Sequence, residues 1–345
     1  MFPRDVPPAA GHLVIVCNSG ANSLSLYELA ALTGRLTPLG TLPLPVDDPP
    51  GDACPMALAP DGRMLYVAFR GARRAVLSFR IAGRELHYAG RAEMAESASH
   101  LSRSADGRCL FATSYQTGTM SVLPVDASGI ALSPTQVIAA APRLHCSAFT
   151  DQSTLHATSI QTDELMAFRY DAGARQLSPA PELAVSCTPG SGPRHLVVHP
   201  NGKTAYVMSE YAAAIDVFAF APGQSPKLVQ SAPAMPAGSN AKPWGADIRI
   251  TPDGRFVYAT ERRTNTISAF ATGSAGRLTP VSHHDTAASP RAFNIDPSGR
   301  HLLVLAEQGN AIESFAIDPA TGRLDKRDEA PTGQGPSWVE LVPLA

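Results

Sequence analysis

The segment MALAPDGRMLYVAF, residues 56–69, places an Asp-Gly turn between two short apolar runs. Asp-Gly in this setting is a strong local signal for a β-hairpin, because glycine readily adopts the positive φ angles that a tight turn needs. Pro60 stands just before the turn and marks the end of the first strand, since proline has no N–H to donate to a sheet. We therefore predict two antiparallel strands joined at residues 60–63.

The same turn recurs along the chain at intervals of 45, 45, 50, 52 and 45 residues. The further copies are Ala105-Asp106-Gly107-Arg108, the degenerate Thr150-Asp151-Gln152-Ser153, Pro200-Asn201-Gly202-Lys203, Pro252-Asp253-Gly254-Arg255 and Pro297-Ser298-Gly299-Arg300. A third apolar run follows each hairpin, as in AVLSFRI after the first, and a weaker fourth run leads into the next copy. Four strands every ~45–50 residues, without helical periodicity, predict a β-propeller.

The two ends of the chain supply one more repeat. The N-terminal runs HLVIVCN, SLSLYEL and LTPLGTLPL provide second, third and fourth strands, and the C-terminal run PSWVELVPL provides the missing first strand. Pairing these runs closes the ring and removes the exposed sheet edges of an open stack. We predict an all-β, seven-bladed β-propeller with four antiparallel strands per blade, in which residues 1–345 form a single domain.

Composition excludes several classes of function. No apolar run approaches the ~18 residues that span a bilayer, which excludes a membrane-spanning protein. The net charge of -2 gives no basic surface for nucleic acid or anionic lipid, so we expect neither partner, and a monomer or weak oligomer. The first residues do not form a signal peptide. Five cysteines without a CxxC pair indicate neither a zinc site nor a disulfide framework, which favours buried thiols and a cytoplasmic location.

Counting from each turn places residues of different blades at equivalent positions. In a propeller the first strand of each blade lines the channel, so these positions surround the channel mouth opposite the turns. Six residues before the turn stand Pro55, His100, His145, His195, Asp247 and Ala292, which puts histidine at one position in three consecutive blades. Seven residues before it stand Cys54, Ser99, Leu144, Arg194, Ala246 and Arg291. Nine residues after it stand Arg70, Tyr115, Ile160, Glu210, Arg262 and Glu307.

These positions gather three His, four Arg and two Glu at one mouth. Ionisable groups that converge in a cleft are typical of a functional site, although a ring of ion pairs between blades would use the same residues. The chain has no G-x-S-x-G elbow, no HExxH pair and no P-loop. We predict no metal and no cofactor.

The sequence resembles the bacterial seven-bladed lactonase family, closest to its propeller-type 6-phosphogluconolactonases, and is similar in fold to carboxy-cis,cis-muconate cyclase. The resemblance covers nearly the whole chain and is carried by the motifs at 192–196, 199–203, 209–210, 244–247, 251–255, 289–294 and 333–339. It implies hydrolysis of a sugar lactone, 6-phosphogluconolactone above all, with a small, anionic lactone as substrate. Arg194, His195, Glu210 and Arg291 fall on matching motif positions, and the resemblance also suggests His145 and Arg262.

The implied chemistry assigns roles to eight residues. Neutral histidine can take a proton from water, and arginine can stabilise an oxyanion or hold a phosphate. The catalytic candidates are His145, His195, Glu210 and Arg194, and the substrate-binding candidates are Arg291, Arg262, His100 and Arg70. Which histidine is the base stays open at this point. Two alternatives also remain, namely cycloisomerisation of a carboxylated muconate and a non-catalytic binding propeller.

Overall fold

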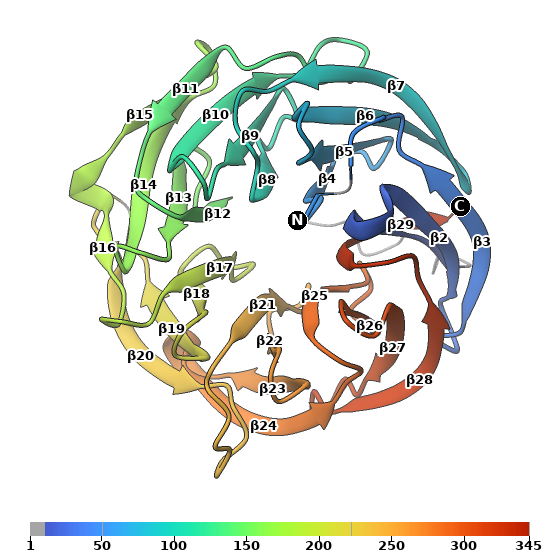
Figure 1. Cartoon of the computed structure of the whole chain (residues 1–345). Helices are drawn as coiled ribbons and strands as arrows, with labels where there is room; N and C mark the ends of the chain where they lie inside the picture. Colours follow the sequence, from blue (N-terminus) through green and yellow to red (C-terminus); the bar gives the residue numbers. More distant parts are fainter. Residues whose placement is uncertain (1–10, 50, 222, 345) are drawn as a thin grey trace.

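Seven antiparallel sheets stand around a central channel in the computed structural model, which describes residues 11–49, 51–221 and 223–344 (Figure 1). This arrangement confirms the predicted seven-bladed β-propeller. The segment in which the sequence predicts no signal peptide includes residues 1–10, which lie outside the described residues.

We number the blades 1 to 7 in chain order, and each is written from its innermost to its outermost strand. Blades 1 to 3 consist of β4 (Met56–Leu58), β5 (Met64–Phe69), β6 (Ala75–Ala82) and β7 (Glu85–Glu93); β8 (His100–Arg103), β9 (Cys109–Thr113), β10 (Thr119–Pro124) and β11 (Gln136–Ala139); and β12 (Leu144–Phe149), β13 (Thr154–Ser159), β14 (Glu164–Asp171) and β15 (Gln176–Pro179), with a short β16 (Val185–Ser186) also paired to β14.

Blades 4 to 7 repeat the pattern. They consist of β17 (Pro193–Val198), β18 (Thr204–Ser209), β19 (Ala214–Ala219) and β20 (Lys227–Pro233); β21 (Gly245–Ile250), β22 (Phe256–Glu261), β23 (Thr266–Thr272) and β24 (Leu278–Asp285); β25 (Pro290–Ile295), β26 (His301–Ala306), β27 (Ala311–Ile317) and β28 (Leu324–Pro331); and β29 (Pro336–Leu344), β1 (Gly11–Asn18), β2 (Ser23–Ala30) and β3 (Leu36–Pro43). The described helices are three 3-10 turns, η1 (Ser19–Ala21), η2 (Pro181–Leu183) and η3 (Ser274–Gly276).

Ring closure joins the two ends of the chain. β29 pairs antiparallel with β1, from Gly11 opposite Leu344 to Cys17 opposite Trp338. The last strand is therefore the innermost strand of blade 7, as the sequence predicts. Because this pairing is part of a sheet, the ring is held by backbone hydrogen bonds as well as by side-chain packing.

Neighbouring blades pack face to face through apolar side chains. One cluster joins blades 7 and 1 around Ile15 and Phe79, and another joins blades 5 and 6 around Tyr258 and Phe293. All five cysteines are buried free thiols within the ring, as predicted from their spacing. Burying this apolar area stabilises the fold by about 25 cal/mol per Å².

Tyrosines on the second strands tie each of three blades to the next. The hydroxyl of Tyr206 donates to the carbonyl of Gly276 at 2.9 Å, and that of Tyr258 donates to Gly322 at 2.8 Å. Tyr66 makes the same bond to Gly129. The acceptor glycines all have positive φ, so the loop carbonyl turns toward the phenol at little conformational cost.

The turn of blade 3 is one residue shorter than the others. In blade 4, Val198 pairs with Ala205 and leaves 199–204 in the turn, whereas in blade 3 Phe149 pairs with Leu155 and leaves 150–154. The innermost strand of blade 3 is therefore shifted by one residue relative to a count from the turn. Cys146, not His145, occupies the position of His195, so the prediction that three blades carry histidine at one position is wrong.

Candidate functional site

A β-bulge at the start of the innermost strands presents residues to the channel mouth. In blade 4, Pro193 pairs with Ser209 and His195 pairs with Met208, which leaves Arg194 without a partner in the ladder. The same irregularity leaves out His145 in blade 3 and Arg291 in blade 6. A bulge residue has no partner on the neighbouring strand, so its side chain points in a different direction from those of its neighbours. His145 thus shares its position with the two arginines.

Threonines of the preceding blade hold the bulges in place. The hydroxyl of Thr113 donates to the carbonyl of His145 at 2.8 Å, and that of Thr158 donates to the carbonyl of Arg194 at 2.7 Å. Both threonines are fully buried near the ends of second strands. Buried side chain to backbone bonds of this kind make the position of each bulge depend on the adjacent blade.

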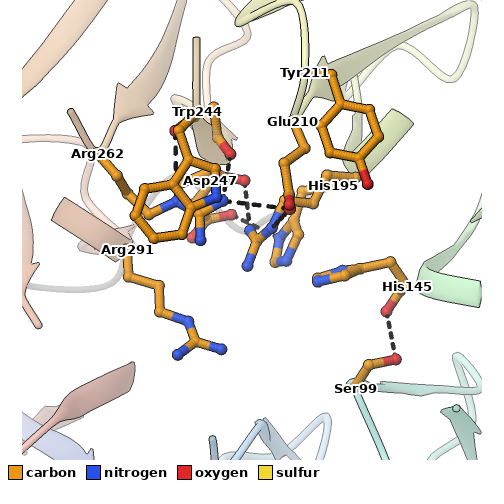
Figure 2. A network of polar contacts seen from close by, with 12 residues as sticks. Ser99, His145, His195, Glu210, Tyr211, Trp244, Asp247, Arg262 and Arg291 are labelled. Atoms are coloured by element: carbon orange, nitrogen blue, oxygen red, sulfur yellow. Dashed lines mark hydrogen bonds and ion pairs between the residues drawn. The ribbon is translucent and has the colours of Figure 1, made fainter. Parts of the chain in front are cut away.

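The bulge residues surround a small cavity of about 30 Å³ at the mouth opposite the Asp-Gly turns. Space of this size accommodates about one water molecule but not a sugar. Five of the eight predicted site residues line it, namely Arg70, His145, Arg194, His195 and Arg291. Figure 2 shows the rings of His145 and His195 and the guanidinium of Arg291 directed toward the same open space.

Glu210 joins two arginines of adjacent blades. Its Oε2 lies 3.1 Å from Nε of Arg194 and 3.3 Å from Nη2 of Arg262. Nη1 of Arg194 donates to the carbonyl of Ala246 at 2.6 Å, so Nη2 is the nitrogen left to face the cavity. Because two guanidinium groups share one carboxylate, this cluster keeps a net positive charge.

Arg262 lies beneath Trp244 and outside the cavity. Its guanidinium carbon is 3.9 Å from the Trp244 ring centroid, and its Nη2 donates to the carbonyl of Gly245 at 2.8 Å (Figure 2). Burial and the nearby Arg194, opposed by Glu210, lower the pKa of Arg262 to about 9. It therefore stays charged at neutral pH and is held by aromatic and backbone contacts.

Arg291 and Arg70 approach the cavity from the other side and share contacts with Asp52. Nη1 of Arg291 donates to the carbonyl of Asp52 at 3.0 Å and forms an ion pair with Glu307. Nη1 of Arg70 lies 3.3 Å from Oδ1 of Asp52. Burial lowers the pKa of Arg70, and Asp52 opposes that shift.

Three buried histidines meet at the cavity. The ring centroid of His195 lies 5.0 Å from that of His145 and 5.7 Å from that of His100. Burial lowers the pKa of His195 to about 4 and that of His145 and His100 well below the usual value. All three are therefore neutral at neutral pH, which is the state that accepts a proton. Nδ1 of His145 has no partner among the described protein groups.

Asp247 contacts His195 from the neighbouring blade. Its Oδ1 lies 2.8 Å from Nδ1 of the neutral His195, a close polar contact without the alignment of an ideal hydrogen bond. Its Oδ2 lies 3.2 Å from Nη2 of Arg249 and accepts the backbone N–H of Phe293 at 3.2 Å. Burial alone would raise the pKa of Asp247, but Arg249, His195 and the N–H donor hold it well below the usual value. The carboxylate is therefore ionised.

Trp338 completes the cavity from the ring-closing strand β29. Its ring centroid lies 5.5 Å from that of His100 and 6.0 Å from that of His195. Its Nε1 donates to Oε1 of Glu340 at 2.9 Å, which fixes the plane of the indole. The wall that Trp338 forms is apolar and packs against the histidine rings.

The structure brings all eight predicted site residues to one channel mouth but divides them. Five line the cavity, whereas Glu210 pairs with Arg194, His100 packs against His195, and Arg262 pairs with Glu210. Asp247 and Trp338 also belong to the site but are not among the predicted site residues, although Asp247 stands at the same counted position as His100 and His195. Within the described ranges, no group of three or more His, Cys, Asp or Glu residues is arranged to hold a metal ion.

Comparisons with known proteins point to lactonases. The family described as "Lactonase, 7-bladed beta-propeller" matches residues 45–341. The chain is 37% identical over 336 residues to a 6-phosphogluconolactonase of Pectobacterium carotovorum, covering 96% of this chain and 99% of that protein. It is 35% identical over 331 residues to the 6-phosphogluconolactonase of Yersinia pestis, covering 95% and 97%. The solved periplasmic gluconolactonase of Pseudomonas aeruginosa is 26% identical, with a TM-score of 0.86, covering 97% of this chain and 100% of that chain.

Proposed function

Because the chain belongs to the seven-bladed β-propeller lactonase family, we propose that it hydrolyses 6-phosphogluconolactone to 6-phosphogluconate. The observation that carries the proposal is a neutral histidine held by an ionised aspartate next to a buried arginine. His195, Asp247 and Arg194 supply this arrangement at the cavity. Ester hydrolysis needs a base for water and a positive group for the carbonyl oxygen.

We assign His195 as the general base. The contact between its Nδ1 and Asp247 favours the tautomer that carries its proton on Nδ1, which leaves Nε2 free to accept a proton. The ionised Asp247 also stabilises the imidazolium that forms. His145 has no acidic partner in the described chain and lies beside Arg194, so its protonated form is disfavoured. We therefore assign His145 to a hydrogen bond with the substrate.

The reaction consumes one water and one ester bond. Water attacks C1 of the lactone while one of its protons passes to Nε2 of His195, and the carbonyl oxygen becomes negative next to Nη2 of Arg194. When the bond between C1 and the ring oxygen breaks, His195 returns the proton to that oxygen, which becomes the C5 hydroxyl. The acid that forms loses its proton to solvent at neutral pH.

The remaining predicted residues divide between substrate contact and support. Arg291 and Arg70 line the cavity, and we assign them to polar groups of the lactone. Glu210 pairs with Arg194, Arg262 pairs with the same carboxylate, and His100 packs against His195. We assign these three as positioning residues. The contacts of Glu210 and Arg262 preorganise the charge that faces the developing oxyanion, and the contact of His100 positions the base.

Substrate consumption tests this proposal directly. Freshly prepared 6-phosphogluconolactone is mixed with the protein in weak buffer, and acid release is followed with a pH indicator against a protein-free blank. We expect acid release well above the blank. Equal rates with and without protein would overturn the proposal, and a carboxylated muconate offered in parallel tests the cycloisomerase alternative.

We further propose that the whole chain is one domain that acts as a monomer or weak oligomer in the cytoplasm, on an anionic lactone, without nucleic acid or membrane partners. Five buried free thiols and the small net charge support these assignments. No helix in the described part of the chain is long and apolar enough to cross a membrane. Because the similar Pseudomonas protein is periplasmic, cell fractionation is the test of location.

A further inference from the structure

A second and larger cavity lies beside the channel mouth, between blades 2 and 3. Its volume is about 540 Å³, in the range of small-molecule pockets, whereas the cavity at the histidines holds about 30 Å³. The polar side chains that line it are Tyr115, Gln116, Thr117, Arg143 and Gln161. A sugar whose carbonyl carbon lies at His195 must place its remaining atoms outside the small cavity.

Tyr115 lines the larger cavity and contacts His145, which lines the small one. It follows the second strand of blade 2, at the position that Glu210 occupies in blade 4. Its ring lies edge-on to His145 with centroids 6.3 Å apart, and the guanidinium carbon of Arg143 lies 5.8 Å from the same ring. Tyr115 therefore lies between His145 and Arg143 and contacts both.

Arg143 differs in its partners from the four predicted site arginines at this mouth. Arg70, Arg194, Arg262 and Arg291 each form an ion pair with a carboxylate. Arg143 forms none with any described residue, and its Nη1 donates instead to the hydroxyl of Tyr211 at 2.9 Å. Its positive charge is therefore uncompensated and accessible, because the side chain is exposed.

The backbone at Arg143 also suggests that the side chain has a role. Its φ is +54°, a left-handed conformation that is strained for a residue with a side chain and easy for glycine. The ring of Tyr211, whose hydroxyl Arg143 contacts, packs tightly against Gly192. A Cβ added at Gly192 would lie only 2.6 Å from Cδ2 of Tyr211. Tyr211 directly follows Glu210, so the bond between Arg143 and Tyr211 links the larger cavity to the catalytic cluster.

We propose that the cavity lined by Tyr115 and Arg143 is the subsite for the phosphate end of a sugar phosphate lactone. Arg143 binds the phosphate, while Gln116, Thr117 and Gln161 offer hydrogen bonds to sugar hydroxyls. A guanidinium without a carboxylate partner suits a phosphate, which takes two parallel N–H bonds. This inference rests on the proposed function for its substrate, and it assigns to Arg143 a part in selecting the phosphorylated lactone.

The substitution Arg143→Gln tests the subsite, because it removes the charge and keeps a hydrogen-bonding group. Hydrolysis of 6-phosphogluconolactone and of unphosphorylated glucono-1,5-lactone is compared in the variant and the wild type. We expect the ratio of kcat/KM for the two lactones to fall about 10- to 100-fold, mainly through KM for the phosphorylated one. Arg263→Gln is the matched control, since Arg263 is a second arginine on this rim without a carboxylate partner among the described residues, and we expect the ratio to be unchanged.

Calorimetric titration with 6-phosphogluconate separates this proposal from the proposed function. We expect the wild type to bind the product and Arg143→Gln to bind it at least tenfold more weakly, whether or not either protein turns over a lactone. An equal loss for both lactones, an effect of Arg263→Gln in place of Arg143→Gln, or unchanged product binding would overturn the subsite. Arg143→Gly relieves the positive φ, so a folded protein with the same loss excludes backbone strain as the cause.

Discussion

Oδ1 of Asp247 lies 2.8 Å from Nδ1 of His195, and the two residues occupy equivalent positions in adjacent blades. The repeat therefore builds an acid–base pair by placing a different side chain at the same position in successive copies. Arg249 and backbone N–H groups keep the carboxylate ionised in a fully buried place. An uncompensated charge there would be strongly destabilising, so Arg249 and these N–H groups are needed to keep the carboxylate next to His195.

Replacing Asp247 with Asn keeps the size and shape of the side chain but removes its charge. We expect kcat to fall about 100-fold or more with KM changed less than about threefold, because Asn no longer stabilises the imidazolium of His195. Asp296→Asn is the control, since Asp296 is also fully buried and its Oδ2 lies 3.7 Å from Nε2 of His12. Both variants should lose stability in thermal unfolding, but only Asp247→Asn should lose kcat in the folded fraction.

The two histidines of the cavity should differ in their effects. We expect His195→Asn to lower kcat about 1,000-fold, as the loss of a general base does, and His145→Asn to lower kcat/KM about tenfold, as the loss of one hydrogen bond does. Steady-state kinetics on 6-phosphogluconolactone measure both. The reverse order would assign the base to His145.

Activity and stability should respond differently to acid. Burial lowers the pKa of His195 to about 4, so the base is unprotonated above that pH, and kcat/KM per folded molecule for unphosphorylated glucono-1,5-lactone should stay level from pH 8 to about pH 5. The unfolded chain binds its proton near the ordinary pKa of about 6.5. Between pH values of about 4 and about 6.5 the unfolded chain therefore binds more protons at this histidine than the folded protein does. As a result, the free energy of unfolding should fall as the pH drops below about 6.5. This lactone has no phosphate that titrates near pH 6, so a kcat/KM that declines with an apparent pKa near 6.5 would contradict the assignment of His195.

Glycines that accept the tyrosine bonds between blades should be sensitive to a side chain. At Gly276 φ is +73°, and a Cβ would lie 2.5 Å from Oγ1 of Thr204. We expect Gly276→Ala to lower the free energy of unfolding by about 2–4 kcal/mol through strain and crowding. Gly83 has a φ of +60° with no atom within 4 Å, so Gly83→Ala should cost only about 1–2 kcal/mol. Chemical denaturation of both variants measures the difference.

The sequence predicts the ring and the location of the site because both follow from a regular repeat. The Asp-Gly turns set the strand boundaries, and ring closure by the run at 336–344 follows from the missing strand at the N-terminus. The count from the turn misplaces His145 by one residue, because the turn at 150–154 is shorter and its sequence, Thr-Asp-Gln-Ser, is degenerate. A count from the turn gives the register of a strand only where the turn has its regular sequence and length.

Residues that act on a neighbouring blade cannot be recognised from the sequence of their own repeat. Asp247 acts on His195, and Trp338 packs against His100, so the role of each depends on contacts between blades and not on its own repeat. The bulges at Arg194 and Arg291 change where side chains point, and no pattern of apolar residues encodes them. The division between residues that line the cavity and residues that support them therefore required the structure.

Single-turnover hydrolysis of freshly generated 6-phosphogluconolactone tests the central claim most directly, because it isolates the chemical step at Arg194. The wild type is compared with Arg194→Ala and with Arg255→Ala, an exposed arginine next to a turn on the opposite rim, after correction for spontaneous hydrolysis. We expect wild type and Arg255→Ala to react equally fast and Arg194→Ala to be about 100-fold slower or more, the loss typical of one oxyanion donor. A folded Arg194→Ala protein that matches the wild type would contradict a lactonase site at this channel mouth.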